Sequence, residues 1–142
     1  MPENEPYQPD NIFARILRNE LPAHKVFEDD VALAFLDIMP QADGHTLVIP
    51  KLAARGLFDM PPDAWGPYME RVQLVAAAVK KGMEAEGLSL RQFEGAAGGQ
   101  TVFHLHFHIL PRWAGVPLRR HGDAIQKPEI LKANAARIRA AF

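Results

Sequence analysis

The chain contains no cysteine, which excludes disulfide bonds and zinc sites built on thiolates. It has no apolar run approaching the ~20 residues of a membrane-spanning helix, and its start lacks the basic-then-apolar pattern of a signal peptide. A formal net charge of −1, with no long basic run, argues against a surface for nucleic acid or anionic membranes. These absences predict a cytoplasmic protein with neither nucleic acid nor membrane as a partner.

The composition is that of an ordinary globular protein. The chain has 142 residues, of which 48% are apolar and 23% charged, a length that suits one domain. Residues 1–10 are largely polar and contain three prolines, so we expect a flexible tail there. Residues 11–142 are expected to form a single domain.

Hydrophobic periodicity predicts an α+β fold. Spacings of three and four indicate helices after Asn11, between Asp63 and Gly87, and near the end of the chain. Runs rich in β-branched and apolar residues predict strands at 25–28, 31–38, 46–49, 88–93 and 103–109. Strands that follow one another closely are expected to pair antiparallel.

The most informative stretch is Phe103–Pro111, which carries three of the six histidines at every second position. In a strand this alternation places His104, His106 and His108 on one face and the apolar residues between them on the other. Pro111 is expected to end the strand. The alternative is a polar strand face without chemistry.

Spacing limits what these histidines can do. At about 3.3 Å per residue, the first and last Cα atoms lie roughly 13 Å apart, so the three imidazoles do not converge easily on one metal ion. Two neighbours, such as His104 and His106, could share a zinc ion. A row of imidazoles suits an extended anionic substrate better, because near pH 7 one ring can attack while another donates a proton.

Three blocks resemble the histidine triad (HIT) family of nucleotide hydrolases and transferases. Gly98-Gly99-Gln100-Thr101-Val102-Phe103-His104-Leu105-His106-Phe107-His108 is similar to the family signature, residues 37–51 to its second block, and residues 12–26 to its amino-terminal block. Together they cover most of residues 11–112. The resemblance implies a five-stranded antiparallel sheet with a short N-terminal helix, a long central helix and a C-terminal helix, usually in a two-fold homodimer.

The resemblance also implies a reaction. His106 would attack the α-phosphorus of a purine nucleotide conjugate and form a covalent nucleotidyl-histidine, which water then cleaves. His108 would contact the phosphate oxygens, His104 would orient the row, and His45 matches the family's fourth histidine. No metal and no other cofactor is expected.

Further positions match the family's nucleotide contacts. Asp37 matches the acidic residue that accepts hydrogen bonds from ribose hydroxyls, and Gly99, Gln100 and Thr101 match positions near the phosphate. An apolar cleft for the base would be formed by Ile12, Phe13, Ile16, Phe35 and Ile38. Without the resemblance, Asp37 would be a strand-end carboxylate, the glycines a turn, and the apolar residues ordinary core.

One position departs from the family pattern. Relatives usually carry Asn or Gln thirteen residues before the middle histidine, where this chain has Phe93. Gln92 is expected on the other strand face, and Glu94 is the next polar candidate. The departure leaves open how the leaving group is handled.

Three functions therefore stay open. The first is hydrolysis of AMP conjugates such as phosphoramidates, and the second is cleavage of dinucleoside polyphosphates, for which Pro111-Arg112 is similar to the corresponding branch. The third is a nucleotide- or metal-binding regulatory module with little turnover. Outside these motifs, His24, His121 and the pair Arg119-Arg120 are expected at the surface.

Overall fold

The computed structural model describes residues 5–120, 122 and 124–142. His121 and residues 1–4 of the expected tail lie outside the described residues. No helix in the described part of the chain is both long and apolar enough to cross a membrane.

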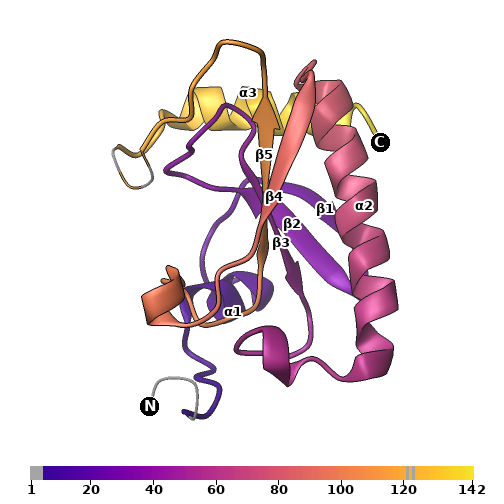
Figure 1. Ribbon diagram of the computed structural model, residues 1–142, viewed down its shortest axis with the longest axis vertical. Helices are drawn as coiled ribbons and strands as arrows, with labels where there is room; N and C mark the ends of the chain where they lie inside the picture. Colours follow the sequence, from indigo (N-terminus) through magenta and orange to yellow (C-terminus); the bar gives the residue numbers. More distant parts are fainter. Residues whose placement is uncertain (1–4, 121, 123) are drawn as a thin grey trace.

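Five strands form one antiparallel sheet in the order β1-β2-β3-β5-β4, which confirms the predicted α+β fold (Figure 1). The strands are β1 (Lys25–Glu28), β2 (Ala32–Leu36), β3 (Thr46–Pro50), β4 (Gly87–Arg91) and β5 (Phe107–Arg112). The helices are α1 (Ile12–Leu17), α2 (Trp65–Gly82) and α3 (Pro128–Arg139), with the short 3-10 helices η2 (Leu57–Asp59), η3 (Pro62–Ala64) and η4 (Ala96–Gly98).

The sheet separates two apolar clusters. Alternate residues of the fully buried β2 point to opposite faces, so that Ala34 packs toward α2 and α3 while Leu33 and Phe35 pack on the other side. Helix α2 buries Tyr68, Val72, Val75 and Val79 at the predicted spacing. The larger cluster thus lies between the sheet and the two long helices, and the opposite face is left for α1 and the site.

Helix α1 forms the second cluster with the sheet. The Asn11 side chain accepts a hydrogen bond from the Ala14 N–H (2.9 Å) and thereby caps the helix. Phe13 and Ile16 are buried against Phe35 and its neighbours. This packing fixes a short helix at the edge of the pocket described below.

Both ends of β5 differ from the prediction, and β2 spans Ala32–Leu36 where the sequence predicts residues 31–38. β5 begins at Phe107, not Phe103, because β3 pairs with it only from Phe107 to Ile109. The Leu105 N–H just before it donates to the Ala54 carbonyl, which belongs to a loop. Pro111 does not end the strand but pairs with Leu88 of β4. The pairing of β5 with β3 has already stopped at Ile109, so β5 has a neighbour on one side only at this position, and the missing N–H of proline is tolerated.

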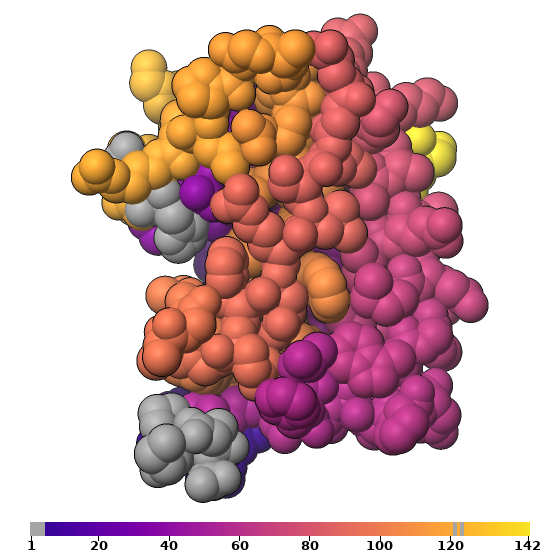
Figure 2. Space-filling view, in the orientation of Figure 1, coloured from indigo at the N-terminus to yellow at the C-terminus, as the bar shows by residue number. Residues whose placement is uncertain are grey.

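β4 also ends earlier than predicted, at Arg91, so Gln92 and Phe93 follow the strand and are not part of it. Beyond β4, in the order of the sheet, no strand of the described residues pairs with this edge. Figure 2 shows β4 and α2 adjoining on one face of the molecule.

Candidate functional site

A pocket of about 310 Å³ opens on the sheet face that carries α1. Its size is at the lower end of the range typical of small-molecule sites. The lining combines an apolar wall with a few polar groups: Ile12, Phe13, Ile16, Leu21, Pro22, Ala23, Phe35, Leu36, Asp37, Ile38, Met39, Leu47, Thr101, Val102, His106 and His108. Residues far apart in the sequence thus meet in one cavity.

The ring of His106 is oriented by its neighbours. Its Nδ1 lies 2.7 Å from the carbonyl oxygen of His104, and an imidazole nitrogen bonds a carbonyl only as a donor. In the neutral ring the proton is therefore on Nδ1, and Nε2 is the unprotonated nitrogen. The Phe13 ring packs against the imidazole at a centroid distance of 4.9 Å. This tautomer is the one that a nitrogen nucleophile requires.

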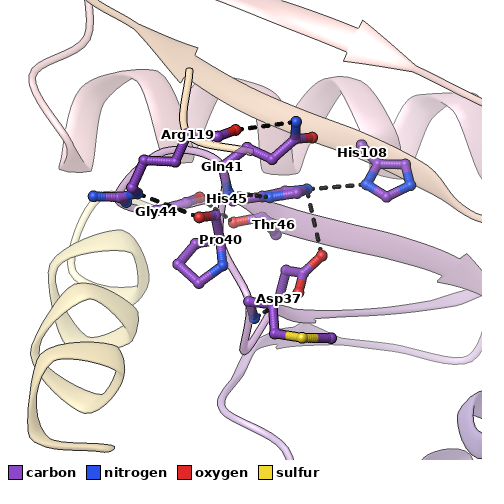
Figure 3. A network of polar contacts seen from close by, with 9 residues as sticks. Asp37, Pro40, Gln41, Gly44, His45, Thr46, His108 and Arg119 are labelled. Carbon is purple, nitrogen blue, oxygen red and sulfur yellow. Dashed lines mark hydrogen bonds and ion pairs between the residues drawn. The ribbon is translucent and has the colours of Figure 1, made fainter. Parts of the chain in front are cut away.

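A second chain of contacts joins the loop after β2 to His108 (Figure 3). The Gln41 N–H donates to His45 Nδ1 (3.1 Å), so neutral His45 carries its proton on Nε2. That Nε2 lies 2.9 Å from His108 Nδ1 and 3.7 Å from an Asp37 carboxylate oxygen. When His45 donates to His108 Nδ1, neutral His108 carries its own proton on Nε2 and is a donor for an anion.

His104 lies beneath the site and not in its lining. It is completely buried, its Nε2 donates to the Pro50 carbonyl (2.8 Å), and its Nδ1 lies 2.6 Å from the Tyr7 hydroxyl. Burial lowers the pKa of His104 from 6.5 to about 4, with the Pro50 carbonyl opposing and His106 adding to the effect. His104 is therefore neutral at pH 7.

The predicted ribose and base residues come together in the pocket. Asp37 directly follows β2 and accepts a hydrogen bond from the Met39 N–H (2.8 Å) through one oxygen. Ile12 and Ile38, 53% and 45% exposed, lie on two sides of the pocket, while Phe13 and Phe35 form its buried wall. Thr101 also lines the pocket.

Gly99 and Gln100 do not line this cavity. The Gln100 side chain donates to the carbonyls of Arg55 (2.9 Å) and Val102 (3.1 Å) and accepts from the Gly95 N–H (2.8 Å). Gly99 has φ 104°, in the left-handed region, and a Cβ there would lie 3.3 Å from the Phe93 ring. In this structure both residues shape the loop before the histidines.

Phe93 occupies the position where relatives carry an amide. Its ring meets His108 edge-on at a centroid distance of 5.3 Å. The neighbouring polar side chains are engaged elsewhere, since Glu94 accepts from the Leu57 N–H (2.6 Å) and from the Gln92 amide (3.0 Å). The neighbour of His108 at this position is thus the apolar ring of Phe93 and not a polar side chain.

Two contacts near the site could not be expected from the sequence. Tyr7, in the expected tail, reaches His104 across 97 residues. Arg119 reaches the loop between β2 and β3, where its guanidinium donates to the Pro40 carbonyl (3.3 Å) (Figure 3). It also donates to the Asp43 carboxylate (2.7 Å). A single tyrosine and a single arginine in irregular stretches have no pattern that would reveal such partners.

A metal ion has one candidate position among the described residues. Ligand atoms of Asp37, His45 and His108 lie within 4.8 Å of one another. For His45 Nε2 to bind a metal, however, its proton would have to move to Nδ1, which already receives the Gln41 N–H. The Nδ1–H of His45 and the N–H of Gln41 would then face each other, so the geometry suits proton transfer better than metal binding.

The fold and the pocket define an α+β protein in which two histidines, one of them held in the Nδ1-protonated tautomer, line a largely apolar cavity. The HIT domain family model matches residues 18–115, and the chain belongs to the HIT family.

Similar proteins include Adenylylsulfatase HINT3 of Arabidopsis thaliana, 38% identical over 131 residues. That match covers 88% of this chain and 66% of the relative, so the chain spans just under two thirds of that relative's length. A solved HIT-like protein from Bartonella henselae, described as involved in cell-cycle regulation, superposes with a TM-score of 0.92 at 50% identity, covering 97% of this chain and 100% of the other. A hypothetical histidine triad nucleotide-binding protein from Sulfolobus tokodaii has a TM-score of 0.82 at 33% identity, covering 91% and 89%.

Proposed function

We propose that this protein hydrolyses conjugates of a purine nucleoside monophosphate, AMP foremost, through a covalent nucleotidyl intermediate on His106. The observation that carries the proposal is the bond from His106 Nδ1 to the His104 carbonyl, which leaves an unprotonated Nε2 on a residue that lines the pocket. The names of the relatives agree with it, since one is an adenylylsulfatase and another is called nucleotide-binding.

The first step forms a bond between His106 Nε2 and the α-phosphorus. The bond from phosphorus to the leaving group breaks, its electron pair departs with that group, and an amine leaving group takes up one proton. The imidazole now carries a positive charge, which the Nδ1–H bond to the His104 carbonyl stabilises. One difficult displacement is divided into two easier ones.

In the second step water attacks the same phosphorus, the bond to Nε2 breaks, AMP leaves and one proton is released. In both steps negative charge grows on the phosphate oxygens, where His108 Nε2–H is the donor. His45 and Asp37 lie behind His108 and stabilise positive charge on that ring as the donor bond strengthens.

The lining of the pocket supports a nucleoside with its base between apolar side chains and its ribose near Asp37. Small leaving groups such as amines or sulfate need few contacts, which suits a site where Phe93 replaces an amide. Arg112, the residue that favoured polyphosphate substrates, lies four positions beyond His108 on β5 and contacts Ser89 (3.5 Å). The second half of a dinucleoside polyphosphate therefore gains no contact from it at the histidines.

The test is mass spectrometry of protein quenched with denaturant at alkaline pH, where a phosphorus–nitrogen bond survives, after mixing with adenosine 5′-phosphoramidate, adenylyl sulfate or a diadenosine polyphosphate. We expect an AMP-sized adduct on His106 and AMP release with the first two substrates, and neither in His106→Ala or His106→Gly. His24→Ala, a histidine outside the pocket, is the matched control and should behave as wild type. Folded wild type that binds AMP but releases none from any of the three would show a binding module instead.

A further inference from the structure

The N-terminal segment contacts the residue on which the nucleophile depends. The Tyr7 hydroxyl lies 2.6 Å from His104 Nδ1, and the two rings meet edge-on at a centroid distance of 5.6 Å. Tyr7 is half-buried and does not line the pocket. Its contact is with a histidine that lies outside the pocket lining.

The contact is directional. Because the Pro50 carbonyl can only accept, His104 must carry its proton on Nε2, and Nδ1 must then accept from the Tyr7 hydroxyl. With the opposite tautomer, an unprotonated Nε2 would face a carbonyl oxygen in a fully buried position, which is costly. Tyr7 and Pro50 thus fix the same tautomer from the two sides of one ring.

The backbone at His104 depends on this anchoring. Residues 103–106 precede β5 and have no ladder partner, so the Leu105 N–H to the Ala54 carbonyl (2.8 Å) is the main-chain bond that holds them there. The His104 carbonyl must nevertheless be aimed accurately, because it accepts the Nδ1 proton of His106. The two bonds to the His104 side chain supply the fixation that a strand would otherwise give.

A second contact ties the same segment down. The Glu5 carboxylate lies 3.7 Å from the Arg55 guanidinium, which in turn lies 4.3 Å above the ring of Phe103, the residue before His104. Arg55 is buried, and its Nε has no hydrogen-bond partner among the described residues. Glu5 is mostly exposed, so its ion pair contributes little and Tyr7 is the effective anchor.

We propose that Tyr7 is a positioning residue for the reaction: by donating to His104 Nδ1 it holds the His104 peptide so that its carbonyl orients His106. The kinetic part rests on the proposed function, whereas the structural part concerns His104 alone. The expected flexible tail then includes one residue whose hydroxyl acts on the site without touching substrate.

The decisive variant is Tyr7→Phe, which keeps the ring and removes the hydroxyl. Nitrogen-15 NMR of the histidine rings should show His104 Nδ1 as a hydrogen-bonded, unprotonated nitrogen in wild type and a clear shift of that resonance in the variant. With an AMP conjugate as substrate, kcat should fall about five- to tenfold, as for the loss of one hydrogen bond, while KM stays within about twofold.

Tyr68→Phe is the matched control, because it removes the only other tyrosine hydroxyl, which donates to the Val48 carbonyl in the core (2.7 Å). It should lower the melting temperature without moving the His104 resonances or kcat. Glu5→Gln should leave kcat nearly unchanged.

An unchanged His104 Nδ1 resonance in folded Tyr7→Phe overturns the proposal, and so does a kcat equal to that of wild type beside an active wild-type enzyme. If wild type hydrolyses no conjugate, the proposed function fails, and the NMR comparison still decides whether Tyr7 fixes His104.

Discussion

At the scale of single residues, backbone partners fix the tautomers of three of the four histidines, and His45 in turn orients His108. His104 and His106 each donate to a carbonyl oxygen, whereas His45 accepts from an N–H, and these contacts set which nitrogen of each neutral ring carries the proton. In the proposed reaction, identical side chains thereby act as an anchor, a nucleophile and a donor. Burial completes the assignment, because it keeps His104 neutral.

The Asp37 carboxylate yields a prediction about ribose. A hydrogen bond to a charged group contributes about 1.5–3 kcal/mol, so wild type should bind AMP about 10- to 100-fold more tightly than 2′,3′-dideoxy-AMP. Asp37→Asn should narrow that ratio, because the amide keeps an oxygen for the Met39 N–H but loses the charge. Calorimetry with both ligands measures the ratio, and Asp63→Asn, an exposed carboxylate outside the pocket, should preserve it. An unchanged ratio in Asp37→Asn would assign the ribose contact elsewhere.

The lowered pKa of His104 predicts how stability depends on pH. The unfolded chain takes up a proton at this residue near pH 6.5, but the folded protein does so only near pH 4. The contribution of His104 to the free energy of unfolding, roughly 3 kcal/mol, is thus complete above about pH 6.5 and is lost as the pH falls to about 4. Urea unfolding at a series of pH values between 7 and 4.5 measures this fall in the free energy of unfolding. NMR signals of His104 that titrate near pH 6.5 in the folded protein would refute it.

At the scale of elements, irregular segments and not the sheet complete the site. Residue 119, in the segment between β5 and α3, exchanges main-chain and side-chain bonds with Gln41, whose N–H orients His45. This segment therefore supports the loop that leads to His108 (Figure 3).

Arg119→Ala tests that support. We expect kcat for an AMP conjugate to fall about three- to tenfold, because the side chain holds Pro40 and Asp43 on either side of Gln41. Arg120→Ala, at the adjacent exposed position, is the matched control and should not change kcat. Equal rates in both variants would show that the main-chain bond from Arg119 to Gln41 suffices.

The elements that could be predicted from the sequence are those with a repeated pattern. The apolar spacing of α2 and the five strand segments were recognisable. The histidine spacing pointed to His106 and His108, which line one pocket, and to His104, which lies beneath it. The start of β5 could not be predicted, because β3 continues to Pro50 while its pairing with β5 stops at Val48 and Phe107. Where two strands part is set by tertiary packing and not by a local pattern. Tyr7 and Arg119 act across 97 and 76–79 residues, distances at which no local pattern exists.

At the scale of the whole molecule, one face has the properties of an interface. The outer edge of β4 has no strand beside it among the described residues, and Figure 2 shows α2 adjoining β4 on this face. Each of the two elements exposes a leucine, Leu74 of α2 at 49% and Leu90 of β4 at 46%. Family resemblance implies a homodimer whose sheets continue into each other. Of the two edge strands, β1 and β4, we predict that β4 forms this contact.

We therefore predict a homodimer with about twice the chain mass of 15.8 kDa in light scattering. Leu90→Lys should shift it toward the monomer, because it places a charge on the pairing edge, where Leu90 is 46% exposed. Leu52→Lys, 48% exposed in the loop after β3 and outside the β4 edge, should leave the dimer intact. A wild-type monomer at high concentration would contradict the prediction.

The two apolar clusters on opposite faces of the sheet bear on how this scaffold can change. The cluster beneath α2 and α3 holds the larger part of the core, while the wall of the pocket belongs to the smaller cluster around Phe13 and Phe35. Substitutions that reshape the pocket therefore disturb the minor share of the packing. Substrate preference can diverge among descendants of such a chain, or be redesigned in the laboratory, while the part that secures folding stays constant.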